Sequence, residues 1–334
     1  MSRNGILFIS LFVLLILLFL ADLALGSIYI PFKEISVALS DPNSDSIYRE
    51  ILLNYRLPKA ITAILAGSAL SVAGLLMQTL FRNPLAGPDV LGVNAGASLG
   101  VALIVMFSSG IGSFFMGFGS WGLVAAAILG AVGVLFLVIL ASIRVPDLIS
   151  LLIIGMMFGY IAGSIVSLIQ NISNPDTLKI FIVWTFGSLS AVSWSMMPVL
   201  VIVVGAGLCI AFLIQKPLNA LLLGENYAIG LGVSISRTRI EIIMATALLA
   251  GGVTAFAGPI AFIGVTVPHI ARGLLKSWNH SVILPASILC GSCLLLLCDI
   301  ASQLPGLKTT LPINSVTALF GAPMIIWILL RNNK

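Results

Sequence analysis

The stretch GPIAFIGVTVPHIARG, residues 258–273, is the most informative about the fold of this chain. Most of its side chains are apolar enough for the inside of a membrane, yet it contains Pro259, Pro268 and three glycines, and it carries His269 and Arg272. Proline removes a backbone donor and clashes with the preceding helical turn, and a bilayer offers no water to unpaired backbone groups. The stretch therefore predicts a membrane segment that is interrupted, not a straight spanning helix.

The composition of the whole chain is that of a membrane protein. Of its 334 residues 60% are hydrophobic and only 8% are charged, and the mean hydropathy is +1.19. Soluble domains carry charges on about a quarter of their residues. The net charge of +5 fits cytoplasmic loops that collect Lys and Arg. We find no basic face with interleaved aromatic residues, so nucleic acid is not an expected partner.

Apolar runs of about 20 residues, the length that crosses a bilayer, recur along the chain. We expect an all-α polytopic membrane protein with about ten transmembrane helices, forming a single domain over residues 1–334. The first run is longer than the hydrophobic region of a signal peptide, which favours a retained first helix. The run 181–214 exceeds one span and is expected to include an external segment. The runs lie near 5–26, 58–81, 92–108, 121–142, 149–170, 181–214, 240–262, 263–275, 282–302 and 313–330.

An internal repeat accounts for the interrupted stretch. When the chain is shifted by 184 residues, 62–67 align with 246–251 with five identities, Gly74 meets Gly258 and Pro84 meets Pro268. Five expected crossings separate the copies, so their orientations are opposite. Inverted repeats interrupted by Gly and Pro are typical of transporters. We interpret NPLAGPDVLG (83–92) and VPHIARG (267–273) as equivalent bends at a pathway, in repeat halves of roughly 56–170 and 239–330.

Four segments together resemble a known family, the FecCD-type permease subunits of type II ABC importers for ferric siderophores, haem and vitamin B12. RLPKAITAILAGSALSVAGLLMQTLFRNPLAGPDVLGVNAGASLG (56–100) and GPIAFIGVTVPHIAR (258–272) resemble its two signatures. LLLGENYAIGLGVSISRTR (221–239) is similar to the loop that contacts the ATPase, and LPINSVTALFGAPMIIWIL (311–329) to the last helix. The resemblance covers nearly the whole chain, in order.

The resemblance implies a ten-helix subunit in the bacterial cytoplasmic membrane. It would work with a second permease subunit, expected to be identical, with two ATPase subunits, with an external binding protein and with membrane lipid, and without a cofactor. The implied activity is ATP-driven import of a metal chelate. Ferric siderophore ranks first because that use is the most widespread in the family, and haem and cobalamin remain alternatives. More Lys and Arg fall on one side of the expected helices, which favours cytoplasmic N- and C-termini.

The loop 215–239 is the expected site of ATPase coupling. The chain has no G-x-x-x-x-G-K-[ST] phosphate loop, so ATP must bind to another chain, and the protein itself is not expected to be an enzyme. Helix formers followed by Gly230 and Gly232 predict a short helix that ends there. The residues that the resemblance assigns to coupling are Gly224, Glu225, Ala228, Leu231 and Gly232.

The resemblance places an inner gate at Asn83 and Leu85, with a second constriction near Leu148 and Ile149. The residue before a proline is biased away from helix, so Asn83, which precedes Pro84, independently favours a non-helical segment at this place. Non-helical backbone at membrane depth is tolerated where it lines a cavity. We expect polar side chains such as Gln78, Ser164 and Ser167 to be available to line the pathway.

Basic residues at the outer end of the second helix are expected to dock the binding protein. The R-L-P-[RK] position of the family, which contacts acidic residues on that partner, appears here as Arg56 and Lys59. A further basic position of the family appears as Gln303, and Lys308 lies five residues on as a substitute. The alternative for these cations is anchoring at the lipid headgroups.

Two other function classes are left open by the residues alone. An ion-driven secondary transporter usually has ionisable residues deep in its spans, and here they are almost absent. An intramembrane enzyme needs a nucleophile with a base or a metal pair. His269 and His280 are not in a metal spacing, and Cys290, Cys293 and Cys298 read as small packing residues. Asp299 near the end of the ninth crossing is either functional or a buried hydrogen-bonding group.

Overall fold

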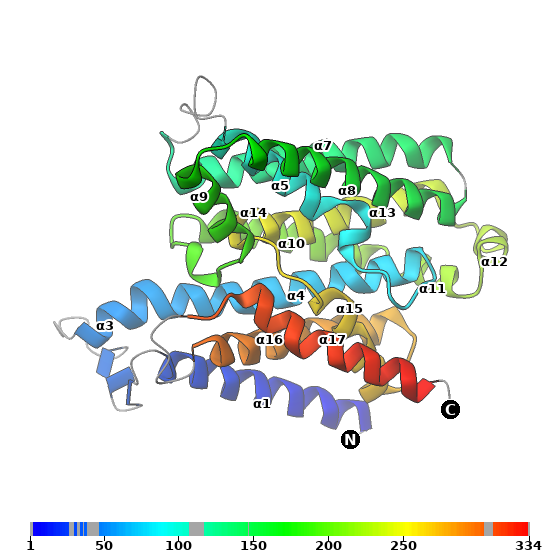
Figure 1. Cartoon of the computed structure of the whole chain (residues 1–334). Coiled ribbons are helices and arrows are strands. Elements are labelled where there is room, and N and C mark those ends of the chain that lie inside the picture. The colour runs from blue at the N-terminus through cyan, green and yellow to red at the C-terminus, as the bar shows by residue number, and fades with distance from the viewer. Residues whose placement is uncertain are drawn as a thin grey trace.

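The computed structural model describes residues 3–26, 30–31, 34–35, 37–38, 47–106, 117–145, 147–303 and 310–332. In these ranges every regular element is a helix, which confirms the all-α class (Figure 1). The elements are α1 (Arg3–Ala24), α3 (Ile47–Ile51), η1 (Leu52–Arg56), α4 (Leu57–Leu80), η2 (Pro88–Leu91), α5 (Val93–Met106), α7 (Ser120–Arg144), α8 (Leu148–Asn171), α9 (Pro175–Thr185), η3 (Leu189–Ala191), α10 (Met197–Leu213), α11 (Gln215–Leu222), α12 (Glu225–Gly230), α13 (Ile235–Thr246), η4 (Ala247–Gly251), α14 (Gly252–Ala257), α15 (Ile263–Leu275), α16 (His280–Ser302) and α17 (Ile313–Asn332).

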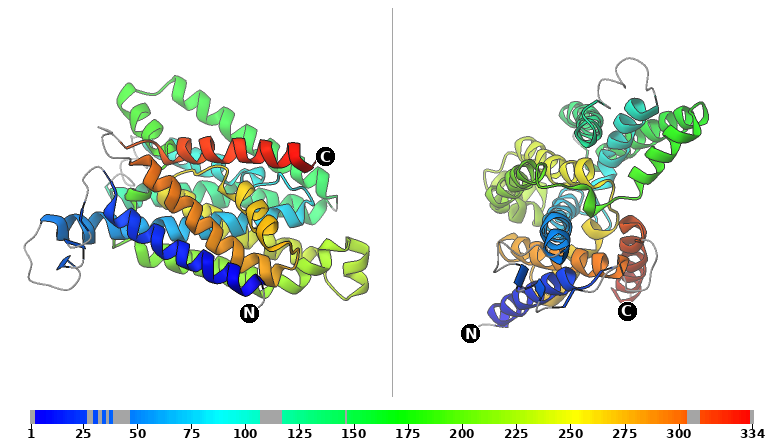
Figure 2. Two further views of the ribbon diagram at one scale, coloured as in Figure 1. Left: turned by 90° about the horizontal axis from the view of Figure 1, so that it is seen from below. Right: turned by 90° about the vertical axis from the view of Figure 1, so that its left-hand side faces the viewer.

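The long helices lie side by side, with both ends of the chain and α12 at one end of the bundle and α3 and α9 at the other (Figure 1). The first of these is called the α12 end below and the second the α9 end. Figure 2 shows α4 near the middle of the bundle, with α16 and α1 on one side and α10 and α13 on another. Nearly every residue of α4 from Pro58 on is buried, because its small side chains allow neighbours to approach on all faces.

Glycines set the closest helix contacts of α4. A Cβ on Gly74 would lie 1.7 Å from the backbone oxygen of Gly264 in α15, and one on Gly67 would lie 2.3 Å from that of Gly291 in α16. No side chain fits at such a distance, so α4 packs backbone to backbone against both helices. This arrangement fixes α15 and α16 around the central helix.

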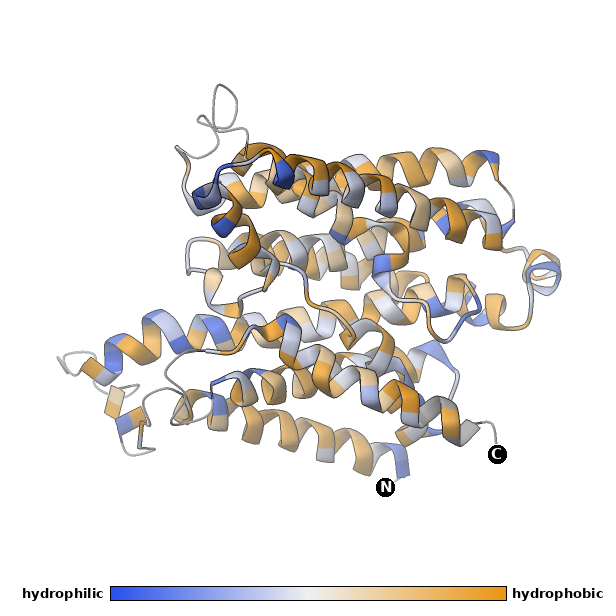
Figure 3. Ribbon diagram, viewed as in Figure 1, coloured by the Kyte–Doolittle hydropathy of each residue, from blue (hydrophilic) through white to orange (hydrophobic). Residues whose placement is uncertain are grey.

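The apolar helices follow the expected crossings closely. Six helices of the described residues are long and apolar enough to cross a membrane, and α10 with α11, which meet at 53°, makes a seventh if the bent pair is one span. Three shorter apolar helices are α5, α15 and the segment Ile313–Trp327 of α17. Figure 3 shows α1, α7 and α8 hydrophobic along most of their length. The protein is a polytopic membrane protein, and the exact count of ten stays a prediction.

The interruption in the opening stretch lies earlier than expected. Helix α14 ends at Ala257, Gly258 has φ +75°, and α15 begins at Ile263 after Phe262 at φ +67°. Residues 267–273 are helical, with Pro268 inside α15, so the interpretation of VPHIARG as a bend is wrong. The carbonyl of Gly264, four residues before Pro268 and thus without its helical donor, lies against Gly74 of α4. Residues 83–92, in contrast, form a loop and the short helix η2.

Candidate functional site

The coupling segment of residues 215–239 folds into α11, α12 and the start of α13. Gly224 (φ +117°) precedes α12 and Gly232 (φ +83°) follows it, and both have backbone angles that favour glycine. Ala228 is the fully buried residue of α12, and its carbonyl accepts a hydrogen bond from the Val233 N–H. The glycines and the small buried alanine therefore hold α12 as a compact turn that projects from the bundle (Figure 1).

The outer surface of this projection is apolar. Four large apolar side chains on or beside α12 are exposed, although this six-residue helix is too short to span a membrane. They are Leu223, Tyr227, Ile229 and Leu231. A Cβ added at Gly224 would meet no atom within 4 Å. Contiguous exposed apolar side chains on a projection are typical of a contact with another protein. Of the predicted coupling residues, Leu231 lies on this surface and Ala228 is buried.

Arg239 of α13 joins α12 to the connection between α7 and α8. Its Nη2 lies 3.8 Å from Oε1 of Glu225, and its Nη1 donates a hydrogen bond of 3.1 Å to the backbone oxygen of Val145. Val145 directly follows α7, and Asp147 caps α8 by accepting 2.7 Å bonds from the Ser150 hydroxyl and backbone N–H. These bonds lower the pKa of the Asp147 carboxyl, so the cap stays charged at neutral pH.

The four predicted gate residues lie at the two segments that follow α4 and begin α8. The Asn83 side chain accepts a 2.9 Å bond from the Leu85 N–H, which forms a tight polar turn. The side chains of Leu85 and Ile149 are 44% and 70% exposed, and Leu148 is half-buried. The chain that follows α4 reaches α8 at η2, because a Cβ on Gly155 of α8 would lie 2.8 Å from the backbone oxygen of Val90.

His269 ties the turn after α4 to α15, a role that the sequence did not indicate. Its Nε2 donates a 2.8 Å hydrogen bond to the backbone oxygen of Pro84. The two residues are 185 positions apart, so no local pattern announces their contact. Gln78 was expected to be available to a pathway, but its side chain is buried and is hydrogen-bonded to the backbone of Val265 and to Arg272. Gln78 is therefore not exposed in this conformation, whereas Ser164 and Ser167 are exposed on α8.

The two basic residues predicted to dock a partner are buried at the α9 end. The Lys59 ammonium lies 2.7 Å from Oδ2 of Asp299 and 3.9 Å from Oδ1 of Asp22. Arg56 donates a 2.7 Å bond to the backbone oxygen of Leu23. Only 6% of Arg56 and 4% of Lys59 is exposed. In this conformation Lys59 joins α4 to α1 and α16, Arg56 joins η1 to α1, and neither faces a partner. Lys308 lies outside the described residues.

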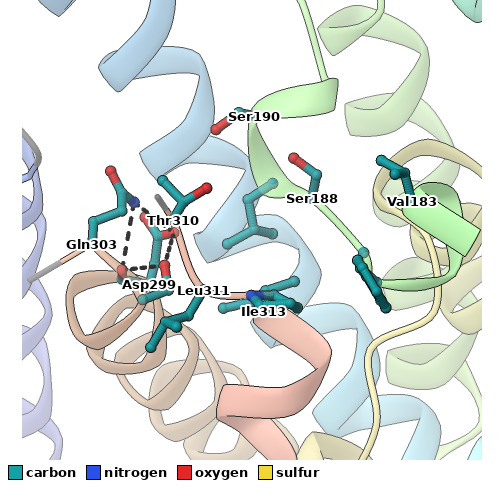
Figure 4. A pocket seen from close by; sticks show the side chains of 13 residues that line it. Val183, Ser188, Ser190, Asp299, Gln303, Thr310, Leu311 and Ile313 are labelled. Carbon is teal, nitrogen blue, oxygen red and sulfur yellow. Dashed lines mark hydrogen bonds between the residues drawn. The ribbon is translucent and has the colours of Figure 1, made fainter. Parts of the chain in front are cut away.

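Asp299 also borders a cavity of about 270 Å³ between α9, η3, α16 and the start of α17 (Figure 4). The Gln303 amide donates a 3.0 Å bond to Oδ1 of Asp299. Gln303 thus stands where the family has a basic residue and here supports the acid that neutralises Lys59. Of the two alternatives left open for Asp299, buried bonding is the one seen. The sequence missed Asp22, which lies at the end of an otherwise uniform apolar run.

Metal ligation is not supported in the part of the chain that the structure covers. All four cysteines are free, and Cys290, Cys293 and Cys298 are buried along α16. Within the described ranges no group of three or more His, Cys, Asp or Glu side chains is placed to hold a metal ion.

Comparisons with known proteins assign the family. The FecCD transport family matches residues 14–331. The hemin transport system permease protein HmuU of Yersinia pestis is 30% identical over 325 residues, covering 97% of this chain and 95% of that protein. The vitamin B12 import system permease protein BtuC of Vibrio cholerae is 34% identical over 335 residues, covering 99% and 95%. The iron(3+)-hydroxamate import system permease protein FhuG of Bacillus subtilis is 32% identical over 325 residues, covering 96% of each.

Solved structures agree with this assignment. An inward-facing structure assigned to the metal-chelate type of ABC transporter matches with a TM-score of 0.85 at 29% identity, covering 98% of this chain and 99% of that one. PsaBC from Streptococcus pneumoniae, at a TM-score of 0.57 and 16% identity, supports the fold alone. The relatives are permeases, which are transport components and not enzymes. The chain therefore belongs to the FecCD transport family and is a permease subunit of an ABC transporter.

Proposed function

We propose that this permease carries a metal chelate inward across the cytoplasmic membrane of a bacterium, driven by ATP hydrolysis on two separate ATPase subunits. The observation that carries the proposal is the connected path from the apolar projection at α12, through Glu225 and Arg239, to Val145, which follows α7 and precedes the proposed gate helix α8. A push on α12 has a direct mechanical route to the residues around Leu148.

The ATPase contact is proposed at the exposed face of α12 and its flanks, with Gly224, Glu225, Ala228, Leu231 and Gly232 as its framework. Ala228 and the two glycines set the shape, because they are buried or have positive φ. Leu231 is exposed and adds apolar area for a partner groove. Glu225 is held by Arg239 and so transmits movement more than it adds affinity.

The gate is proposed between the Asn83 turn and the start of α8. Leu85 and Ile149 present exposed apolar side chains at the α12 end, and the chain after Leu85 packs against α8 at η2. A constriction of apolar side chains closes a water-filled path by excluding water. Asn83 holds the turn that carries Leu85, and Asp147 caps the helix start that carries Leu148 and Ile149.

A second, identical permease subunit is proposed to cover α8 and α17. Both helices leave large apolar side chains exposed, among them Tyr160 and Leu168 on α8 and Leu319 and Ile326 on α17. Figure 2 shows the two helices on the same side of the molecule. A pathway between two copies would place the exposed Ser164 and Ser167 of α8 near its wall.

The membrane topology is proposed as ten crossings with both termini cytoplasmic. The bent α10–α11 pair and the three shorter apolar helices support that count, since they lie where the remaining crossings are expected. The α12 end carries Arg82, Arg144, Arg237 and Lys276, and the excess of Lys and Arg at this end supports a cytoplasmic assignment. The repeat halves 56–170 and 239–330 belong to the same proposal.

Ferric siderophore is the proposed substrate, with haem and cobalamin as alternatives. The relatives named above are described as carriers of hemin, vitamin B12 and iron(3+)-hydroxamate, which are all bulky metal chelates. An external binding protein is proposed to select the chelate and deliver it at the α9 end. Because Arg56 and Lys59 are buried, the contact with that protein is proposed to involve other groups at this end, together with Lys308.

The test is uptake into proteoliposomes that contain the permease, its ATPase and its binding protein. We expect ATP-dependent accumulation of a ferric hydroxamate, measured with radioactive iron, and no uptake driven by a proton or sodium gradient alone. Haem and cyanocobalamin in parallel vesicles decide between the substrate alternatives. Uptake that follows an ion gradient without ATP would refute the proposal.

A further inference from the structure

A second cavity lies at the α12 end, between the last turn of α15 and α17. Its volume is about 790 Å³, and Arg272, Lys276 and Trp278 line one side. Met324 and Trp327 of α17 line the other. The predicted coupling residues and gate residues are not among those that line it. Only Pro84, whose carbonyl is already bonded to His269, connects the cavity to the gate turn.

The cavity carries two positive charges without a carboxylate partner. The Arg272 guanidinium donates a 2.7 Å bond to the neutral amide oxygen of Gln78 and stacks over the Trp278 ring at 4.9 Å. Lys276 caps α15 in the left-handed region at φ +50° and is exposed. Across the described residues, neither cation lies within ion-pair distance of an acid; the ion pairs seen there involve Lys59, Arg237 and Arg239.

The Arg272 side chain is already held in place before any ligand binds, and Lys276 stands at the C-terminus of α15. The C-terminus of a helix favours positive charge through its dipole, and Gln78 and Trp278 fix the guanidinium plane of Arg272. A planar guanidinium with free N–H groups binds a phosphate through two parallel hydrogen bonds. A neighbouring ammonium adds a point charge to the same anion.

The remaining lining favours a lipid over a small ion. Ile270, Leu274 and Met324 give the cavity apolar walls, which a free phosphate would not use. Trp278 and Trp327 are both exposed near helix ends, the position in which tryptophan sits at the headgroup level of a bilayer. Basic pockets between membrane helices on the cytoplasmic side are a known setting for acidic headgroups.

We propose that this cavity binds an anionic phospholipid of the inner leaflet, with its phosphate on Arg272 and Lys276 and an acyl chain along α15 and α17. The proposal uses the cytoplasmic assignment of the α12 end made above, but the binding itself is independent of transport. Because Arg272 is bonded to Gln78 of α4 and α15 is bonded to the gate turn through His269, an occupied site would brace the inner end of α15.

The test is lipid binding by the purified full-length permease in detergent, measured by native mass spectrometry and by the shift in unfolding temperature. Dimyristoyl phosphatidylglycerol should bind and raise the unfolding temperature, whereas dimyristoyl phosphatidylcholine and inorganic phosphate should not. Lys276→Asn, which keeps a residue that tolerates the left-handed region, should weaken phosphatidylglycerol binding about fivefold, and adding Arg272→Gln should weaken it further by a similar factor. Arg144→Gln, which removes an exposed charge from the same end outside the cavity, should leave it unchanged.

Three outcomes would overturn the proposal. In the first, all of the variants bind phosphatidylglycerol as the unaltered protein does. In the second, inorganic phosphate protects the protein as well as the lipid does, which would identify a site for free anions. In the third, Lys276→Asn releases the ATPase on copurification while lipid binding is unaffected, which would make the cavity part of a protein interface. Since Lys276 is exposed and lacks a protein partner among the described residues, this variant keeps its fold even if Arg272→Gln does not.

Discussion

Lys59 is surrounded at the α9 end by carboxylates from two other helices, and its chemistry differs from that of a surface cation. Its ammonium and both acids are almost completely excluded from solvent. Desolvation of a charge is costly, so an isolated member of such a group is far less stable than the paired set. The cluster therefore acts as an internal connection of α1, α4 and α16.

This predicts a large effect of Lys59→Met and a smaller one of a compensated double variant. Lys59→Met leaves Asp22 and Asp299 without their cation and should cost about 3–5 kcal/mol of unfolding free energy. Lys59→Met combined with Asp299→Asn should recover part of that loss. Chemical unfolding in detergent micelles measures both. The control is Arg237→Met, which breaks an ion pair whose Arg237 side chain is 81% exposed, and which should cost less than about 1 kcal/mol. Equal losses for both pairs would contradict the internal connection.

Gly74 is the second residue with a sharp expectation. A methyl group there would lie 1.7 Å from the Gly264 backbone oxygen, so Gly74→Ala must separate α4 from α15. We expect a loss of about 1–3 kcal/mol or more in unfolding free energy, together with reduced expression of folded permease. Gly133→Ala in α7 is the matched control, because a Cβ there meets no atom within 4 Å, and it should be neutral or stabilising. Wild-type stability of Gly74→Ala would show that α15 can move away freely.

At the scale of the elements, the proposed coupling route runs from α12 through Arg239 of α13 to Val145, between α7 and α8. Arg239→Met removes the bonds to both Glu225 and Val145 while leaving the exposed face of α12 unchanged. We expect the ATPase to copurify normally and ATP-driven uptake to fall about tenfold, since hydrogen bonds of a charged group contribute about 1.5–3 kcal/mol. Arg237→Met on the same helix should transport normally. Loss of the ATPase from Arg239→Met would mean that the arginine shapes the contact surface instead.

A complementary change belongs to α12 itself. Leu231→Glu places a charge on the proposed contact surface without affecting a buried side chain, because Leu231 is exposed. We expect the permease to fold and to reach the membrane but to lose most of its ATPase on copurification, as expected for a charge placed in an apolar interface core. Retention of a full complement of ATPase would move the contact elsewhere.

The elements were largely predictable from the sequence, and their exceptions have physical causes. Spans such as α4, α8 and α16 follow from apolar runs bounded by charge or by glycine. The sequence predicted a bend at Pro268 because proline leaves the carbonyl four residues earlier without a helical donor. That carbonyl belongs to Gly264, and Gly74 of α4 packs against it, so the helix continues. The burial of Lys59 was missed because its partners, Asp22 and Asp299, are distant in the sequence and each stands alone in an apolar run. The end of the short helix at Gly230 and Gly232 was predictable, since a glycine at a helix C-terminus is a local feature.

At the scale of the whole molecule, the proposed second copy covers the exposed faces of α8 and α17, and the proposed gate then lies between the two copies. We expect Leu168→Cys to form a disulfide with its counterpart in the partner copy, or to be cross-linked to it by a short bifunctional reagent, in native membranes. Gel migration at twice the monomer mass measures this. Ile202→Cys, on an exposed position of α10, is the control and should stay monomeric. The reverse pattern would place the pair on the other side of the molecule.

The gate itself predicts a change in accessibility during the cycle. Cysteines at 83, 85 and 149 should react with a membrane-impermeant thiol reagent at rates that differ between ATP-bound and nucleotide-free transporter, because the proposed constriction opens and closes on these segments. Inside-out vesicles labelled with and without ATP provide the measurement. Rates that are constant through the cycle would contradict the gate assignment.

The ion cluster at the α9 end also has a consequence for how the protein is made. Membrane helices enter the bilayer in the order in which they are synthesised, and an acid in an apolar segment opposes entry. Lys59 is inserted early, close behind Asp22, and so a positive charge is already in place when the helix that carries Asp299 leaves the ribosome. When α16 is inserted, Asp299 can therefore pair with Lys59, which is already in the membrane. A chain that lacks Lys59 should stop in biogenesis at the insertion of α16, before the permease is folded.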